Sequence, residues 1–332
     1  MEDRNAFQSM ETRTSQPIAT TSPTVNIAYE LCIIEFRVIS LLSIIISPVG
    51  MVLNAIVLWF LHFQMHRNTF SAYVFNLAVA DFLFLCPQFI FSFFIVCTQY
   101  YIVKLYIRYY LDTVTIFAYV FSLSIITIIS IECCLLVMCP IWYRCQRPRH
   151  TSSVTCVLLW VLSLLFTFLN KYACILLFPH LNIVWCKKFD IINSVWIIVL
   201  FVVLCGSCLT LLLRISCGSQ QIPVTRLYVT VALRVLFCLI FGIPFGIYWI
   251  VDHWNEDNNY SRICGFSYDI LYLYSINTCA NATIYFLVGS IRHGKFQRMT
   301  VKLILQRAIQ DTPEEEGGER SPSENPAELG PV

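Results

Sequence analysis

Charged residues are scarce in this sequence. Lysine, arginine, aspartate and glutamate together make up 13% of its 332 residues, whereas hydrophobic residues make up 58%. A soluble domain carries about a quarter of its residues as charged side chains, because it must cover its surface with groups that water solvates. The composition therefore excludes an ordinary water-soluble protein, and we expect an integral membrane protein.

Several other features are missing. Basic and acidic residues nearly cancel to a net charge of +2, which indicates no nucleic-acid partner. The sequence has no metal-ligand cluster, glycine-rich phosphate loop or nucleophile–base pair at a workable spacing, so we do not expect an enzyme. The first 34 residues have no short apolar core followed by a cleavage site, and we expect targeting to rest on the first membrane span. Most of the sixteen cysteines lie in apolar runs, which predicts small buried side chains rather than disulfides.

Long apolar runs are what the sequence has in abundance. A helix that crosses a bilayer needs about 20 mostly apolar residues. Seven stretches meet this requirement, namely residues 38–61, 69–98, 105–138, 151–178, 191–215, 227–251 and 265–288. The sequence therefore predicts an all-α membrane protein, a seven-transmembrane helical bundle over residues 36–288, with its two termini on opposite sides of the membrane.

The distribution of basic residues predicts the orientation of this bundle. Loops that face the cytoplasm are enriched in lysine and arginine close to the spans. The denser set here is Arg67, Arg144, Arg147, Arg149, Arg214 and Arg226, although the loops on the other side are also basic. We therefore expect the N-terminus, residues 1–35, to be an extracellular tail at the plasma membrane.

Two further segments follow the last predicted span. Residues 289–310 repeat apolar side chains at helical spacing with basic residues between them, which is typical of an amphipathic cytoplasmic helix on membrane lipid. A basic solvated linker is the alternative. Residues 311–332 are acidic and rich in proline, glycine and serine, so we expect a disordered tail.

An acidic residue, Asp81, lies near the middle of the second span. Ionisable groups inside a bilayer are costly and are usually functional. We expect Asp81 to face polar side chains of other spans, and the candidates are Asn54, Ser122, Asn277 and Asn281. Such a ring of oxygen atoms has two interpretations that stay open: a site for Na⁺, or a hydrogen-bond network that fixes helix packing.

The inner half of the bundle carries a second pair of charges. Glu132 lies near the end of the third span, and Arg234 lies ten residues before Pro244 in the sixth. Our hypothesis is that Arg234 pairs with Glu132 and holds the two spans together at rest; the alternative is that it bonds Asn281 or backbone carbonyls. Pro244, flanked by Gly242 and Gly246, predicts a hinge in the sixth span.

Two cysteines on the predicted outer side stand apart from the buried ones. Cys174 ends the fourth span and Cys186 precedes the fifth, and we expect them to form a disulfide in that oxidising space. Cys32 and Cys264 are candidates for a second bridge between the N-terminal tail and the third outer loop.

Several motifs resemble those of the rhodopsin-like G protein-coupled receptors. They are Gly50-x-x-x-Asn54, Asn76-Leu-Ala-Val-Ala-Asp81, Trp160 and Asn281-Ala-Thr-Ile-Tyr285. Within that class the chain is similar to the Mas-related receptors of sensory neurons and mast cells, through Pro140-Ile-Trp-Tyr-Arg-Cys145, Cys156-Val-Leu-Leu-Trp160, Ile222-Pro-Val-Thr-Arg-Leu-Tyr228 and Gly242-Ile-Pro-Phe-Gly246. The resemblance implies an outward ligand pocket, coupling to a heterotrimeric G protein inside, and a fourth-to-fifth-span disulfide that matches Cys174 and Cys186.

The chain departs from this pattern in two motifs that the class uses to bind and activate its G protein. It reads Glu132-Cys133-Cys134, so Cys133 stands where the class has an arginine. Ala282 replaces the proline of the motif that ends at Tyr285. On this resemblance we assign G-protein contact and activation to Glu132, Cys133 and Tyr285, and on the pairing hypothesis above we add Arg234.

The ligand side also departs from the pattern. Where relatives that bind cationic ligands pair a glutamate with an aspartate, this chain has Asn170 and Asp190. We expect Asp190 to contact a peptide or small-molecule ligand, with Asp112, Asp269, Asn170 and Lys171 around it. Two alternatives remain: a receptor homologue that couples weakly because Cys133 replaces the arginine, and, more remotely, an ion-coupled transporter.

Overall fold

The computed structural model describes residues 23–63, 69–97, 101–148, 150–169, 183–217, 226–254 and 266–290, and every element within these ranges is a helix. The long helices are α2 (Pro23–Phe63), α3 (Thr69–Cys97), α4 (Tyr101–Met138), α6 (Thr151–Phe168), α7 (Ile183–Cys217) and α10 (Phe266–Ser290). A short helix, α5 (Pro140–Gln146), follows α4. The predicted amphipathic helix from residue 291 and the acidic tail lie outside the described residues.

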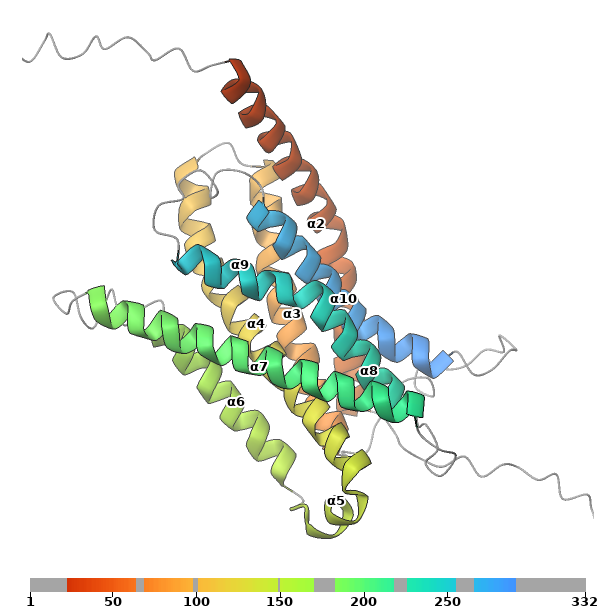
Figure 1. Ribbon diagram of the computed structural model, residues 1–332. Helices are drawn as coiled ribbons and strands as arrows, with labels where there is room; N and C mark the ends of the chain where they lie inside the picture. The colour runs from red at the N-terminus through yellow and green to blue at the C-terminus, as the bar shows by residue number, and fades with distance from the viewer. Residues whose placement is uncertain are drawn as a thin grey trace, which may run out of the picture.

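Helices of membrane-spanning length run side by side in one bundle (Figure 1). Among the described residues, six segments are long and apolar enough to cross a membrane: Ile34–Phe63, Phe70–Cys97, Tyr110–Met138, Thr151–Phe168, Lys188–Arg214 and Leu227–Val251. Helix α10 packs against α2, α3, α8 and α9 and completes the bundle. The described part of each of the seven predicted spans therefore lies on helical structure. We call the end of the bundle that carries α5 the α5 end.

The helices extend beyond several of the predicted spans. Helix α2 begins at Pro23, within the predicted N-terminal tail, and α7 begins at Ile183 rather than at residue 191. A helix rises 1.5 Å per residue, so these helices are longer than a hydrocarbon core about 30 Å thick. Their extra turns carry polar and charged residues, which an apolar-run criterion leaves out.

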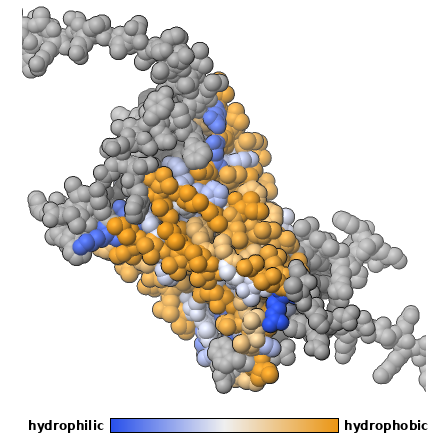
Figure 2. All heavy atoms as spheres, in the orientation of Figure 1, coloured by the Kyte–Doolittle hydropathy of each residue, from blue (hydrophilic) through white to orange (hydrophobic). Residues whose placement is uncertain are grey.

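The outer surface of the bundle is apolar. Large side chains such as Ile45, Val157 and Val202 are about two-thirds exposed, and Figure 2 shows hydrophobic residues over most of the visible face of the described helices. In water this surface would be unfavourable, whereas lipid tails solvate it. Helix α4 lies inside, with Tyr119, Phe121 and Ile125 fully buried.

Helix α6 contacts the bundle along a narrow stripe. Its buried residues are Ser152, Cys156, Leu159, Ser163 and Thr167, which are spaced three or four apart and are small except for leucine. Small residues allow helix backbones to approach closely within a membrane. Trp160 adds one polar contact, because its Nε1 donates a hydrogen bond of 2.8 Å to Asn76 Oδ1 on α3.

The sixth span is irregular where a hinge was predicted. It consists of α8 (Arg226–Phe237), the π-helical turn η2 (Cys238–Gly242) and α9 (Ile243–Trp254). The Ile243 N–H reaches back five residues to the Cys238 carbonyl. Pro244 follows and has no N–H to donate, which favours such a widened turn. Tyr119 of α4 donates a 3.3 Å hydrogen bond to the Gly242 carbonyl, so α4 is attached to the irregular turn.

Candidate functional site

Asp81 on α3 lies at the centre of a buried polar network. Its side chain is 1% exposed. The Ser122 hydroxyl of α4 donates to one carboxylate oxygen at 3.2 Å, and the Asn281 amide of α10 donates to the other at 2.8 Å. The network therefore links α3, α4 and α10, and it includes two of the four residues that were expected to surround Asp81.

The other two expected partners do not contact the carboxylate. Asn54 donates instead to the backbone carbonyls of Gly50, at 3.0 Å, and Thr278, at 3.4 Å, so it joins α2 to α10. Asn277 is fully buried, and its side-chain amide has no hydrogen-bond partner among the described residues. Sequence reasoning selected four buried polar residues, but it could not assign the direction of each amide.

Arg234 lies beside this network and does not pair with Glu132 as we hypothesised. Its side chain is 3% exposed, and its Nε donates to Asn281 Oδ1 at 3.4 Å. Its guanidinium carbon lies 4.7 Å from the centre of the Tyr285 ring, a cation–π contact. The structure therefore favours the alternative, in which Arg234 bonds Asn281. Glu132 takes its ion-pair partner elsewhere, at Arg147.

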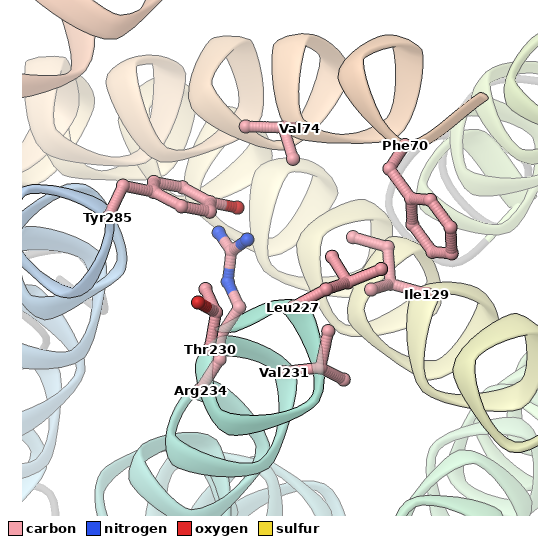
Figure 3. Close-up of a pocket in the computed structure, with 8 residues that line it drawn as sticks. All are labelled: Phe70, Val74, Ile129, Leu227, Thr230, Val231, Arg234 and Tyr285. Carbon is pink, nitrogen blue, oxygen red and sulfur yellow. The ribbon is translucent and has the colours of Figure 1, made fainter. Parts of the chain in front are cut away.

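A small pocket adjoins the Arg234 side chain (Figure 3). Apolar side chains of α3, α4 and α8 form most of its wall, and the polar members are Thr230, Arg234 and Tyr285. The close-up shows the guanidinium pointing at the Tyr285 ring. The Tyr285 hydroxyl is buried and has no hydrogen-bond partner among the described residues. Two of the residues assigned to activation, Arg234 and Tyr285, thus lie together, whereas Glu132 does not join them.

Glu132 has a different cation, Arg147, which follows α5. The Arg147 Nη2 lies 2.5 Å from one carboxylate oxygen and 2.7 Å from the other. Tyr73 of α3 donates to Glu132 at 2.6 Å, and Tyr143 of α5 donates at 2.9 Å. Arg147 also donates to Ser152 of α6 at 3.0 Å. We call Glu132, Tyr73, Tyr143 and Arg147 the Glu132 cluster; it ties four helices together at the α5 end.

The charges of the Glu132 cluster support one another. The Glu132 and Arg147 side chains are 9% and 10% exposed, so water screens their attraction only weakly. Burial alone would disfavour the charged guanidinium, but the hydrogen bonds and charge of Glu132 outweigh it and raise the pKa of Arg147. Burial and the same carboxylate also raise the pKa of Tyr143, which therefore stays a hydrogen-bond donor.

Sequence reasoning missed the partners of Glu132. It treated Arg147 only as a loop charge, and it did not select Tyr73 or Tyr143. The only signal was the spacing Pro140-Ile-Trp-Tyr, in which proline at the first position favours a helical turn and can bring Tyr143 back toward α4. Cys133, where the class has its arginine, is fully buried in the core.

The predicted ligand residues lie toward the other end of the bundle. Asp112, Asp190 and Asp269 are partly buried, near the beginnings of α4, α7 and α10. The Asp190 carbonyl accepts a 2.8 Å hydrogen bond from Ser194. Asn170 and Lys171 lie outside the described residues. So do Cys174 and Cys264, and the Cys174–Cys186 and Cys32–Cys264 disulfides therefore stay predictions.

The bundle and its buried polar network define a multi-pass membrane protein of the seven-helix receptor class. No family model matches the chain. Individual relatives do. The chain is 68% identical to Mas-related G-protein coupled receptor member B3 of Mus musculus over 313 residues, which cover 94% of this chain and 100% of that protein. It is 57% identical to member B2 of Mus musculus over 300 residues, covering 90% and 89%.

A third relative extends the likeness to another branch of these receptors. Mas-related G-protein coupled receptor member X2 of Mus musculus is 51% identical over 275 residues, which cover 83% of this chain and 78% of that protein. The chain therefore belongs to the Mas-related G protein-coupled receptors. This confirms the resemblance read from the motifs and the predicted seven-helix bundle. The relatives are receptors, so the chain is not an enzyme.

Proposed function

We propose that this receptor lies in the plasma membrane with its N-terminus outside, binds an extracellular peptide or small molecule, and activates a heterotrimeric G protein at the α5 end. Its family supports the receptor role, and the dense basic loops at the α5 end support the orientation. By the same family resemblance, sensory neurons or mast cells are the cells in which it acts.

The observation that carries the coupling proposal is the Glu132 cluster. A receptor that signals must exchange an inactive packing for an active one. The cluster holds α3, α4, α5 and α6 together at the end where the G protein would bind. The class normally has an arginine at the position of Cys133. In this chain Arg147 supplies the positive charge instead, so Glu132 still has an ion-pair partner that can hold the inactive packing.

The ligand would bind at the opposite end. Asp190 and the weaker candidates Asp112 and Asp269 offer partly buried carboxylates there, and Asn170 and Lys171 belong to the last third of the predicted fourth span. A charge-assisted contact between a carboxylate and a cationic ligand contributes about 1.5–3 kcal/mol. Because Asn170 replaces a glutamate, we expect weak binding of ligands with two positive charges. A Cys174–Cys186 disulfide would connect the fourth and fifth spans at this end of the bundle.

A second candidate function is a receptor homologue that binds ligand but couples weakly. The fully buried thiol of Cys133 favours it. This thiol cannot replace the charged, multidentate donor that an arginine offers to a G protein.

A ligand screen with a second-messenger readout, in cells that express this chain, tests the proposal. We expect at least one cationic peptide or small molecule to produce a response, and Asp190→Asn to lower its potency about tenfold or more at equal surface expression. Ligand binding without any second-messenger response would support the weakly coupling alternative. Unchanged ligand potency in the Asp190→Asn receptor would show that Asp190 does not contribute to ligand binding.

A further inference from the structure

Asp81 and Arg234 are ionisable side chains buried in the same part of the bundle. They are 1% and 3% exposed, and each lies within the field of the other. Removing a lone charge from water costs several kcal/mol even after the protein relaxes. Two opposite charges at this depth therefore stabilise each other, and each would be costly alone.

One amide group joins the two charges. Asn281 donates from Nδ2 to Asp81 Oδ2 at 2.8 Å and accepts at Oδ1 from Arg234 Nε at 3.4 Å. The amide dipole thus has its positive end at the carboxylate and its negative end at the guanidinium. This is the orientation that both charges favour, and it makes a continuous path from α3 through α10 to α8.

A sodium ion, the other interpretation of Asp81, does not fit this arrangement. Na⁺ requires oxygen atoms directed at it. Here Ser122 and Asn281 present hydrogen atoms to the carboxylate, and each of its oxygens already accepts a hydrogen bond. The amide of Asn54 turns away to the carbonyls of Gly50 and Thr278. The guanidinium of Arg234 adds a positive charge that would repel the ion.

We propose that Arg234 is the permanent counter-charge of Asp81, acting through Asn281, and that it takes the place of a bound sodium ion. The Tyr285 ring covers the guanidinium at 4.7 Å and keeps it beside Asn281. A diffusible ion can leave during activation, whereas Arg234 is fixed to the sixth span and moves with it. The stability and ligand binding of this receptor are therefore independent of Na⁺.

Thermal unfolding of the purified full-length receptor tests this, in NaCl and in choline chloride at equal ionic strength. We expect the wild-type midpoint to be the same in both salts. Arg234→Leu removes the repelling charge and frees the Asn281 amide to turn its oxygen toward a cation beside Asp81. Its midpoint should therefore be lower in choline and should rise with Na⁺ concentration. Arg234→Lys keeps a positive charge and should remain insensitive to Na⁺.

The double variant Asp81→Asn/Arg234→Leu is the control, and it should lose the Na⁺ response of Arg234→Leu. A wild-type midpoint that rises in NaCl, and does not rise in Asp81→Asn, would overturn the proposal. So would an Arg234→Leu receptor with the same midpoint in both salts. If Arg234→Leu does not fold, the wild-type and Arg234→Lys receptors still test the proposal, because both are expected to have the same unfolding midpoint in NaCl and in choline chloride. None of these measurements needs a G protein, so their outcome is separate from that of the proposed signalling function.

Discussion

Glu132 takes its cation from outside its own helix. In receptors with an arginine next to this acid, the cation comes from the same helix. Here the next residue is Cys133, and the cation comes from Arg147, fifteen positions further along the chain. The two tyrosines complete the acceptor's coordination. The ion pair of Glu132 thus depends on the short segment that contains α5.

Arg147→Ala should weaken that state. Removing one partner of a largely buried ion pair leaves the other charge unpaired, which costs about 3–5 kcal/mol. We expect raised basal second-messenger production in cells that express the variant, measured at equal surface expression. Arg214→Ala is the matched control, because Arg214 is exposed at the same end and donates a weak 3.5 Å hydrogen bond to the Met138 sulfur. Basal activity equal to wild type in Arg147→Ala would show that the pair does not restrain signalling.

The pairing of these residues was the part of the site that sequence reasoning could not find. Asp81, Ser122 and Asn281 were predictable as a group, because each is a polar residue inside an apolar run. Arg147 lies in a loop, where a charged residue is ordinary. Whether it turns toward Glu132 depends on the path of the chain after Met138, and residue spacing does not determine that path. The same limit made the Glu132–Arg234 hypothesis wrong.

At the scale of helices, Gly246 allows α9 to approach α4 and α7. A Cβ atom at this position would lie 2.5 Å from the Tyr119 hydroxyl oxygen and 2.7 Å from a ring carbon of Phe201. Both neighbours are buried. Glycine is therefore required here by close packing, beside the turn to which Tyr119 is hydrogen-bonded.

Gly246→Ala should lower the thermal stability of the purified receptor. Forcing a methyl group into a filled interface costs about 1–3 kcal/mol. Gly206→Ala is the control, because a Cβ at Gly206 of α7 meets nothing within 4 Å. It should be neutral or should stabilise the helix by up to about 1 kcal/mol through alanine's better helix propensity. Equal unfolding midpoints for the two variants would contradict the packing argument.

The helices themselves were well predicted, because a bilayer requires long apolar runs and the chain contains seven. Their ends were less well predicted. The start of α7 carries Lys187, Lys188 and Asp190, which resemble a loop, yet the helix continues through them. The sequence predicted a hinge near Pro244, but it did not predict that the backbone there forms a π-helical turn. Apolar composition determines which residues lie in lipid, and it does not determine where a helix ends in water.

For the whole molecule, the orientation in the membrane is a prediction from charge. We expect an epitope at the N-terminus to be labelled by antibody on intact cells that express the receptor. An epitope at the C-terminus should be labelled only after the cells are permeabilised. The physical reason is that the basic loops at the α5 end resist translocation. Labelling of the C-terminal epitope on intact cells would reverse the orientation and the proposed positions of ligand and G protein.

Because α6 has a narrow contact with the bundle, forces in the surrounding lipid can act on the structure of this receptor through α6. The helix presents a broad apolar face to the membrane and adheres to α3 and α4 through a seam of mostly small side chains and the Trp160–Asn76 hydrogen bond. Lateral pressure of the bilayer therefore acts on the wide lipid-facing side of α6, and the narrow packing seam with α3 and α4 opposes it. Changes in bilayer thickness or tension would therefore reach the bundle through α6. From there they would pass to Asn76, five residues before Asp81 on the same helix.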